Sequence, residues 1–284
     1  MKSIKKMLSM LLVAVFILVM PMVSFAEDSI NLNDSMSIDK RPTPYTLEGL
    51  NNELKQIGFP ENIISEMPLE DKQHIIGKNP VGLFSIETQE FSIDENGEMK
   101  EIKANKGEYG PFATIPTTDL KMTTSVVDLG RISGRQTYTL YYQWDWKKTT
   151  SFAWTDRVAL SYNDEFQTRI SNNGDYYCRS SAYREGSTLP PTSTNCGGRT
   201  ADATFGGASW NYDMKLGDLN SGVVSMDIET KALNKSGNLI TLAKYYHKKG
   251  VPGSLGLSIG YATISVISGS NYDEAASQGS KAYK

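Results

Sequence analysis

Cysteine and histidine are scarce in this chain of 284 residues, which holds two of each. Two cysteines exclude a disulfide-dense scaffold. Two histidines with no H-E-x-x-H pattern exclude a histidine-rich metal protein and that class of zinc protease. The sequence also lacks a P-loop and a dinucleotide-binding glycine fingerprint, and its formal net charge of −3 excludes nucleic-acid binding driven by bulk positive charge. We therefore expect no cofactor and no nucleic-acid partner.

Calcium is the one metal for which a fragment of a pattern exists. Asp94, Asn96 and Glu98 place oxygen-bearing side chains at alternate positions of one turn. An EF-hand loop needs glycine at its sixth position and glutamate at its twelfth, whereas this segment has Gly97 at the fourth and Asn105 at the twelfth. The segment is therefore predicted to be a plain turn, and no metal ligand is assigned.

The first 26 residues have the three parts of a secretory signal peptide. Lys2, Lys5 and Lys6 form a cationic start, residues 7–23 are uncharged and mostly apolar, and Ser24-Phe25-Ala26 supplies small residues for cleavage. We expect cleavage after Ala26, secretion from a bacterium, and no permanent membrane anchor afterwards. An uncleaved anchor is the alternative, because the apolar stretch is nearly long enough to span a bilayer. Without these three lysines the chain keeps 26 of its 29 basic side chains against 32 acidic ones, and the net charge falls from −3 to −6.

The segment after the signal peptide divides into a linker and a small mixed region. Residues 27–44 are polar and are predicted to be a disordered linker. Residues 45–118 are predicted to form a small α+β region with three short helices between 45 and 78, where prolines and glycines mark the helix ends. A β-hairpin with an Asn-Gly turn is expected over 83–103. The glycine- and proline-rich stretch 104–118 is expected to be the domain boundary.

Residues 119–284 are predicted to form a β-sandwich domain. One strand alternates strictly, with an aromatic-rich set on one face: Tyr138, Leu140, Tyr142, Trp144 and Trp146. Further short strand patterns follow with turns between them, and no convincing long helix interrupts them. The fold class is therefore mainly β, an antiparallel β-sandwich or barrel-like sandwich, preceded by a small helical cap with a β-hairpin. In the last strand pattern, Ser254–Ile267, the alternation slips near Tyr261-Ala262, which predicts a β-bulge or a bend between sheets.

The two cysteines are predicted to pair. In an exported protein, Cys178 and Cys196 form a disulfide by default. In the chain-entropy model a loop of this length is stabilised by about 3 kcal/mol. A catalytic thiol is disfavoured because no activating base is evident, and a closed zinc site would need both histidines as well.

No common catalytic motif is complete in this sequence. Residues 256–260 match G-x-S-x-G, but no histidine follows Ser258 and residues 261–267 are strand-like, which excludes a nucleophile elbow. His74, in a predicted helix, and His247, at a predicted strand end, are both expected to be exposed. Carboxylate catalysis stays open, because a glycosidase needs only two suitably spaced acids. Acids lie among the aromatic residues of the β half, at positions Asp145, Asp156, Asp164, Glu165, Asp202 and Asp213.

Candidate ligand-binding residues are Tyr141, Trp154 and Asp156. Tyr141 lies on the strand face opposite the aromatic set, and Trp154 lies beyond that strand, so both are better surface candidates than the alternating aromatics. Aromatic rings stack on sugars, and a neighbouring acid can bind hydroxyl groups. The alternative is that these aromatics belong to the core of the sandwich.

Two segments resemble uncharacterised exported proteins of Gram-positive bacteria: residues 54–72, beginning Leu54-Lys55-Gln56-Ile57-Gly58-Phe59-Pro60, and residues Trp154-Thr155-Asp156-Arg157-Val158. The resemblance covers about a third of the chain. It implies export, and it implies nothing about chemistry.

Three functional hypotheses follow. The leading one is a secreted, non-enzymatic β-sandwich module that binds a glycan, a cell-wall polymer or a protein surface. The second is an extracellular hydrolase, such as a glycosidase, that uses carboxylates. The third is a secreted membrane-active or toxin-like protein, because the Gly- and Ser-rich apolar stretch Leu255–Ile267 could line a β-barrel pore, although a buried sheet explains that stretch as well.

Overall fold

The computed structural model describes ten stretches of the chain: residues 46–93, 99–102, 119–149, 155–169, 176–184, 192–194, 196, 202–248, 255–269 and 272–284. The predicted signal peptide and the predicted linker lie outside these residues, as do the turn at 94–98 and the stretch 104–118. Among the described residues, no helix is both long and apolar enough to cross a bilayer.

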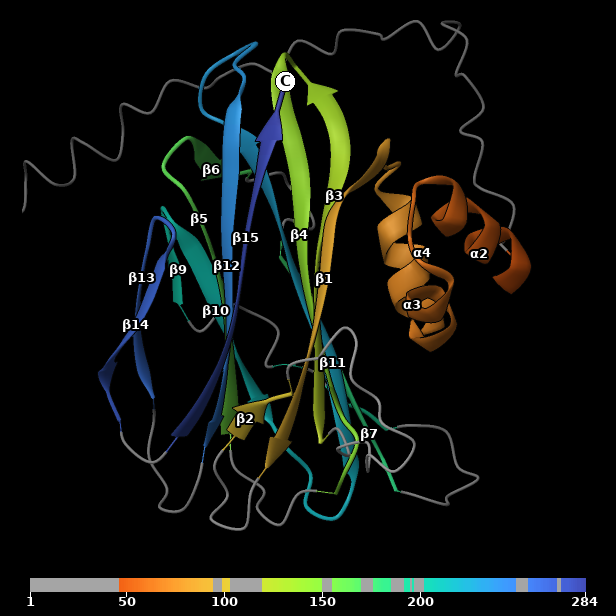
Figure 1. Cartoon of the computed structure of the whole chain (residues 1–284), viewed down its shortest axis with the longest axis vertical. Helices are drawn as coiled ribbons and strands as arrows, with labels where there is room; N and C mark the ends of the chain where they lie inside the picture. Colours follow the sequence, from red (N-terminus) through yellow and green to blue (C-terminus); the bar gives the residue numbers. More distant parts are fainter. Residues whose placement is uncertain are drawn as a thin grey trace, which may run out of the picture. The chain divides into compact units, whose positions relative to one another are not determined.

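Three short helices open the described chain, as the sequence predicts: α2 (Leu47–Gln56), α3 (Glu61–Glu66) and α4 (Leu69–Gly77) (Figure 1). The Thr46 hydroxyl caps α2 by accepting a hydrogen bond of 3.1 Å from the Gly49 amide. Residues at helical spacing on the three helices turn inward and are buried: Leu50, Leu54, Ile63, Ile64, Ile75 and Ile76. The helices therefore form an apolar underside that needs a partner surface.

Two antiparallel sheets form the rest of the fold (Figure 1). Sheet A has the order β2-β1-β3-β4-β11-β7-β8, with β6 also paired to β11. Its strands are β1 (Gly82–Ile93), β2 (Met99–Glu101), β3 (Leu120–Ile132), β4 (Arg135–Trp146), β6 (Phe166–Thr168), β7 (Tyr176–Tyr183), β8 (Thr192–Thr194) and β11 (Leu219–Thr230).

Sheet B has the order β15-β12-β5-β10-β9. Its strands are β5 (Thr155–Tyr162), β9 (Asp202–Thr204), β10 (Gly207–Asp213), β12 (Gly237–Lys248) and β15 (Tyr272–Tyr283). A separate two-stranded sheet consists of β13 (Gly256–Gly260) and β14 (Thr263–Ser268). Every strand pair is antiparallel, so the predicted fold class, a mainly β antiparallel sandwich with a helical cap, is confirmed.

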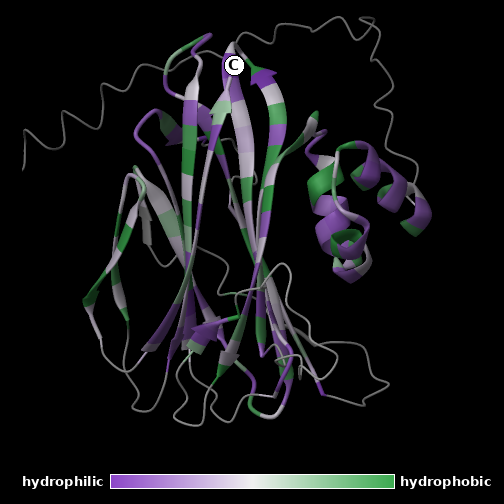
Figure 2. Cartoon of the chain, viewed as in Figure 1, coloured by the Kyte–Doolittle hydropathy of each residue, from purple (hydrophilic) through white to green (hydrophobic). Residues whose placement is uncertain are grey.

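The core lies between the inner faces of the two sheets. Hydrophobic and hydrophilic residues alternate along the long strands, as the colour bands of Figure 2 show. The aromatic face predicted for β4 points inward, and Trp144 and Trp146 are at most 1% exposed. These rings meet Trp210, Tyr212 and Tyr245 of sheet B in one hydrophobic cluster. The indole N–H of Trp146 donates a hydrogen bond of 2.9 Å to the Tyr245 hydroxyl, so its one polar atom is satisfied inside the core.

The helices and the β13–β14 hairpin cover opposite outer faces. The apolar underside of the helices packs on Val127, Leu129, Tyr141 and Val223 of sheet A. The hairpin packs on Ala159 and Tyr246 of sheet B. The molecule therefore has a helical cap on one sheet and a hairpin on the other (Figure 1).

The strands on either side of the expected domain boundary belong to one sheet. β1 precedes residues 104–118 and pairs with β3, which follows them, from Gly82↔Asp128 to Phe91↔Leu120. Residues 45–284 form a single compact unit. The predicted hairpin exists as β1 paired with β2, but its first strand extends into the sandwich and does not stay in a separate small region.

The C-terminal part differs from the sequence prediction in two ways. The alternation slips at Tyr261-Ala262 because a hairpin turn between β13 and β14 lies there, with Ala262 at a φ of +49°, and neither a bulge nor a bend between sheets is present at that point. Beyond it, β15 pairs with β12 over its whole length, although its many small polar residues gave no strand signal.

The predicted disulfide is confirmed: Cys178 of β7 is bonded to Cys196. Cys196 is buried, and Cys178 packs against the main core. Since β7 continues into β8 near the edge of sheet A, the bond fastens the returning chain to that edge.

The packing of Trp144 depends on a glycine in the neighbouring strand. Gly222 lies directly opposite Trp144, and a Cβ atom there would overlap the indole ring and crowd the Arg179 carbonyl. Because the ring is fully buried, it has no free space to move into. We expect Gly222→Ala to lower the free energy of unfolding by about 1–3 kcal/mol in urea titrations.

The matched control is Gly77→Ala, at the end of α4, where a Cβ atom would meet nothing within 4 Å. Removing glycine from a helix should leave stability unchanged or raise it slightly. Equal effects of the two substitutions would show that the contact between Gly222 and Trp144 does not limit the packing.

Candidate functional site

Two of the three predicted ligand residues are buried, and the third is not described. Tyr141 does lie on the outer face of sheet A, as its position in the alternation predicts, but the helical cap covers it and leaves it 4% exposed. It is therefore not a surface platform. Trp154 lies outside the described residues.

Asp156 is fully buried and serves as a hydrogen-bond acceptor between strands. Its carboxylate accepts from the Tyr245 hydroxyl at 2.5 Å and from the Lys248 amide at 3.0 Å, and it lies 3.0 Å from Nδ1 of His247. The pKa of Tyr245 is raised well above 10, first by burial and then by the Asp156 charge. Asp156 thus joins β5 to β12 inside the core, where it is not accessible to a ligand in solution.

Both histidines were expected to be exposed, whereas His247 is buried and His74 is half-buried. His247 is 6% exposed because its ring packs against Trp146, with ring centroids 4.8 Å apart. His74 points from α4 onto sheet A, where it stacks on Tyr177 with centroids 3.9 Å apart and meets the edge of Tyr141 at 5.8 Å. Helical periodicity places His74 on a face of α4, but it does not reveal that this face is covered.

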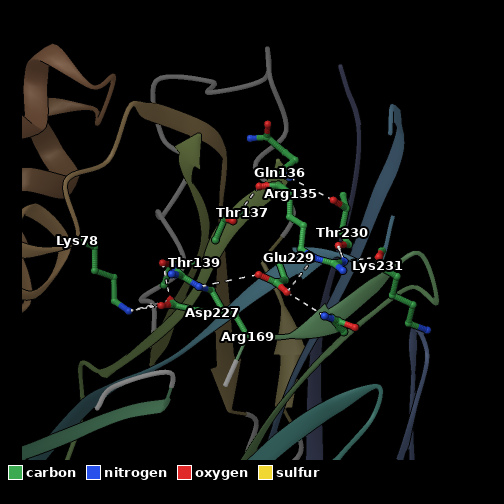
Figure 3. Close-up of polar contacts among 11 residues, drawn as sticks. Lys78, Arg135, Gln136, Thr137, Thr139, Arg169, Asp227, Glu229, Thr230 and Lys231 are labelled. Atoms are coloured by element: carbon green, nitrogen blue, oxygen red, sulfur yellow. Dashed lines mark hydrogen bonds and ion pairs between the residues drawn. The ribbon is translucent and has the colours of Figure 1, made fainter. Parts of the chain in front are cut away.

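A row of polar contacts that was not predicted from the sequence lies along the outer face of β11, at the alternate residues Ser225, Asp227 and Glu229. Ser225 lies 3.3 Å from Nε2 of His74. Asp227 accepts from Lys78 Nζ at 2.7 and 2.8 Å and from the Thr139 hydroxyl at 2.7 Å (Figure 3). The period-2 alternation of β11 could have shown that these side chains share a face.

Glu229 continues this row beyond the cap. It accepts from Gln167 at 2.9 Å, and the Arg135 and Arg169 guanidinium groups lie 3.6 and 3.9 Å away (Figure 3). Arg135 also donates to the carbonyl oxygens of Thr230, at 2.6 Å, and of Lys231. The row therefore fixes the end of β11 and the start of the turn that follows.

A second ion pair ties the cap to β7. Asp71 of α4 accepts from Nε of Arg179 at 2.8 Å, from a terminal nitrogen of the same guanidinium, and from the Tyr177 hydroxyl at 3.2 Å. Burial and the charge of Asp71 raise the pKa of Tyr177 to about 12. Beside this group lies a cavity of about 20 Å³ lined by Tyr141, whose hydroxyl has no hydrogen-bond partner among the described residues. This volume is sufficient for a single water molecule.

The contacts of Asp71 and Asp227 attach the cap, whereas those of Glu229 lie beyond it. A glycosidase needs two carboxyl groups that face a substrate across an open gap. Asp71, Asp227 and Glu229 each face a cationic side chain where a glycosidase carboxylate would face its substrate. Among the described residues, no group of three or more His, Cys, Asp or Glu could hold a metal ion.

A different surface lies on the turns at one end of the sandwich, and we call it the turn surface: Phe205, Lys231, Leu233 and Tyr261. The side chains of Phe205 and Leu233 are 89% and 59% exposed. Gly206 lies against the Gly260–Tyr261 backbone, and Lys231 Nζ lies 4.4 Å from the centre of the Tyr261 ring. The turns β9–β10, β11–β12 and β13–β14 thus meet through direct contacts.

No protein-family model matches the sequence, and no curated protein matches it. Several solved structures match parts of the chain, and three of them are as follows. A "pore forming protein" is 13% identical, with 67% of this chain and 95% of that chain covered and a TM-score of 0.32. The collagen-binding subdomain of the Enterococcus faecalis surface protein ACE is 9% identical, with 56% and 94% covered and a TM-score of 0.32. Clostridium perfringens delta-toxin is 10% identical, with 70% and 86% covered and a TM-score of 0.26. Structural similarities this low do not support any inference about function.

The half-buried His74 makes attachment of the cap dependent on pH. Burial, with a contribution from the Lys78 charge, lowers its pKa from 6.5 to about 4. Between these values the unfolded chain binds a proton that the folded protein does not, so stability is complete above pH 6.5 and falls as the pH drops towards 4. We expect the free energy of unfolding of the wild type to decrease more steeply over this range than that of His74→Gln, as measured by urea titration.

The comparison with His74→Gln removes the contribution of all other titrating groups, because glutamine keeps a polar group beside Ser225 and binds no proton. Parallel pH profiles for the two proteins would contradict the assignment. A profile that keeps diverging below pH 4 would do so as well.

Proposed function

We propose that the protein is an extracellular, non-enzymatic binding module, and that the turn surface binds a partner protein. The main support for this proposal is Phe205, whose aromatic ring is 89% exposed on a turn with a hydrogen-bonded backbone. Secretion is supported by the signal-peptide pattern of residues 1–26 and by the Cys178–Cys196 disulfide.

The backbone around Phe205 is held by hydrogen bonds, while its side chain is exposed to solvent. The Tyr162 hydroxyl donates to the Phe205 carbonyl at 2.9 Å, and the Thr204 hydroxyl donates to the Ile259 carbonyl at 2.9 Å. The next residue, Gly206, has no room for a Cβ atom against the β13–β14 turn. Folding gains little from a ring held out in water, whereas protein interfaces are anchored by aromatic side chains on rigid backbone.

The residues around Phe205 favour a protein over a glycan. Sugar-binding sites use stacking rings together with acids and amides that bind hydroxyl groups. The other residues of the turn surface are the aliphatic Leu233 and the cation Lys231, whose charge lies over the neutral Tyr261 ring. A protein with an apolar, acidic patch is the complementary partner.

The test is binding of the purified protein to a panel of immobilised extracellular-matrix proteins, with a glycan array and isolated cell walls run in parallel. We expect binding to a matrix protein that weakens at least tenfold, about 1.4 kcal/mol, in Phe205→Ala and further in the double variant with Leu233→Ala. Added salt should slow association, because Lys231 contributes charge.

Leu216→Ala is the matched control: its side chain is 61% exposed, and it lies in the β10–β11 turn, at the other end of β10 from Phe205. Binding that is insensitive to Phe205→Ala, or confined to glycans and lost in Trp154→Ala, would refute the turn surface as the contact site.

A further inference from the structure

The β13–β14 hairpin is an insertion between two strands that already pair with each other. β12 and β15 are aligned from Gly237↔Tyr283 to Lys248↔Tyr272, so the chain leaves sheet B at Lys248 and returns beside it at Tyr272. The hairpin forms its own two-stranded sheet. The sandwich therefore does not depend on the hairpin for any of its strand pairing.

The hairpin has one apolar and one polar face. In its ladder Ile259 pairs with Ile264 and Leu257 with Val266, and cross-strand partners share a face. The other face carries small polar or glycine residues, where Ser258 pairs with Ser265 and Gly260 with Thr263, and Ile267, which lies at the register shift of the ladder, is 70% exposed. Leu257, Ile259 and Ile264 are buried against sheet B, whereas Ser258, Thr263 and Ser265 are exposed.

The segment that contains the hairpin is uncharged over a length that suits a bilayer. Residues 251–272 include no Asp, Glu, Lys, Arg or His. Ten of these residues precede the turn at Tyr261-Ala262 in the sequence and ten follow it, and the described strands β13 and β14 take up five and six of them. A tilted β-strand crosses the hydrocarbon core in about 9–11 residues, with apolar side chains towards lipid alternating with polar ones towards the lumen.

The polar contacts that hold the hairpin to sheet B include the hydrogen bond of 2.9 Å from the Thr204 hydroxyl of β9 to the Ile259 carbonyl. Ser161 donates to the Gly260 carbonyl at 2.6 Å and accepts from the Thr263 amide at 3.2 Å, and the Tyr162 carbonyl accepts from the Ala262 amide at 2.7 Å. Arg157 donates to the Leu255 carbonyl, but it also contacts the Ser209 hydroxyl at 3.1 and 3.2 Å. Release of the hairpin therefore leaves the Arg157 side chain with a partner.

We propose that the β13–β14 hairpin leaves sheet B and inserts into a lipid bilayer, its apolar face towards the lipid. A single hairpin would expose two unpaired strand edges to hydrocarbon, which is unfavourable, and only a closed barrel removes them. Several copies of the chain must therefore each contribute a hairpin to one barrel, with the serine and threonine face lining a water-filled lumen. This activity does not use Phe205 or Leu233, although the hairpin turn supplies Tyr261 to the turn surface.

Release of a trapped dye from vesicles tests the proposal, with one set made of phosphatidylcholine and a second that also contains phosphatidylglycerol. We expect the full protein to release dye with a cooperative dependence on protein concentration. A variant in which residues 255–267 are replaced by a short Gly-Ser linker should keep the circular dichroism spectrum and melting temperature of the sandwich and lose release entirely, since β12 and β15 pair without the hairpin.

A labelling experiment locates the hairpin directly. Because the described cysteines are joined in the disulfide, an introduced cysteine is the single labelling site for a polarity-sensitive dye. Ser258→Cys and Ser265→Cys report the polar face, and Leu257→Cys and Ile264→Cys report the apolar face. On vesicles we expect lipid-attached quenchers to act at the last two positions, and a water-soluble quencher to act at the first two.

Dye release by the hairpin-replaced variant, or no release and no change in label environment with folded wild type on both vesicle types, would overturn the proposal. Phe205→Ala separates this activity from the proposed function: it should release dye at the wild-type rate even where it fails to bind a partner protein. Loss of matrix-protein binding with intact dye release therefore tests the turn surface alone.

Discussion

Packing of the β4 aromatic face against sheet B is the interaction on which the rest of the structure depends. Trp144 and Trp146 occupy the space between the sheets, and each needs a particular neighbour: a residue without a side chain at position 222, and the Tyr245 hydroxyl for the indole N–H of Trp146. The same hydroxyl donates to Asp156, which also contacts His247. A buried carboxylate is tolerated here because several donors surround it at once. The hydrogen-bonded polar groups at this end of the core are therefore positioned by the packing of the two tryptophans.

The two outer faces are used differently. On sheet A, ion pairs at Asp71 and Asp227 combine with the apolar underside of the helices, so the cap is joined by both kinds of interaction. On sheet B the hairpin is held mainly by a few aliphatic side chains and hydrogen bonds between neutral groups. Partly buried ion pairs fix one arrangement of the groups that they join, whereas aliphatic contacts are easily exchanged for other apolar surroundings. The cap is thus the more firmly specified of the two attachments.

The sequence predicts the helices and strands of this fold better than it predicts which of them pack or pair with one another. Strict alternation along β4 identified the core face, and the Pro and Gly positions marked the helices, because these signals depend on local geometry. The burial of Tyr141 and His74 could not be predicted, since it arises from contacts between α4 and strands far along the chain, such as Asp71 with Arg179. The β13–β14 turn was misread because Tyr261-Ala262 has none of the residues that favour a positive φ. β15 was missed because its small polar residues show no clear alternation of hydrophobicity, and its strand conformation comes from pairing with β12.

The full-length pairing of β12 with β15 has a consequence for how the chain could change over evolution. The excursion starts and ends at neighbouring residues of adjacent strands, so loop-closure entropy sets little limit on what lies between Lys248 and Tyr272. Insertions, deletions or the exchange of one hairpin for another at this point leave the register of every strand in both sheets unchanged. The sandwich can therefore serve as a constant frame on which this segment diversifies faster than the rest of the sequence.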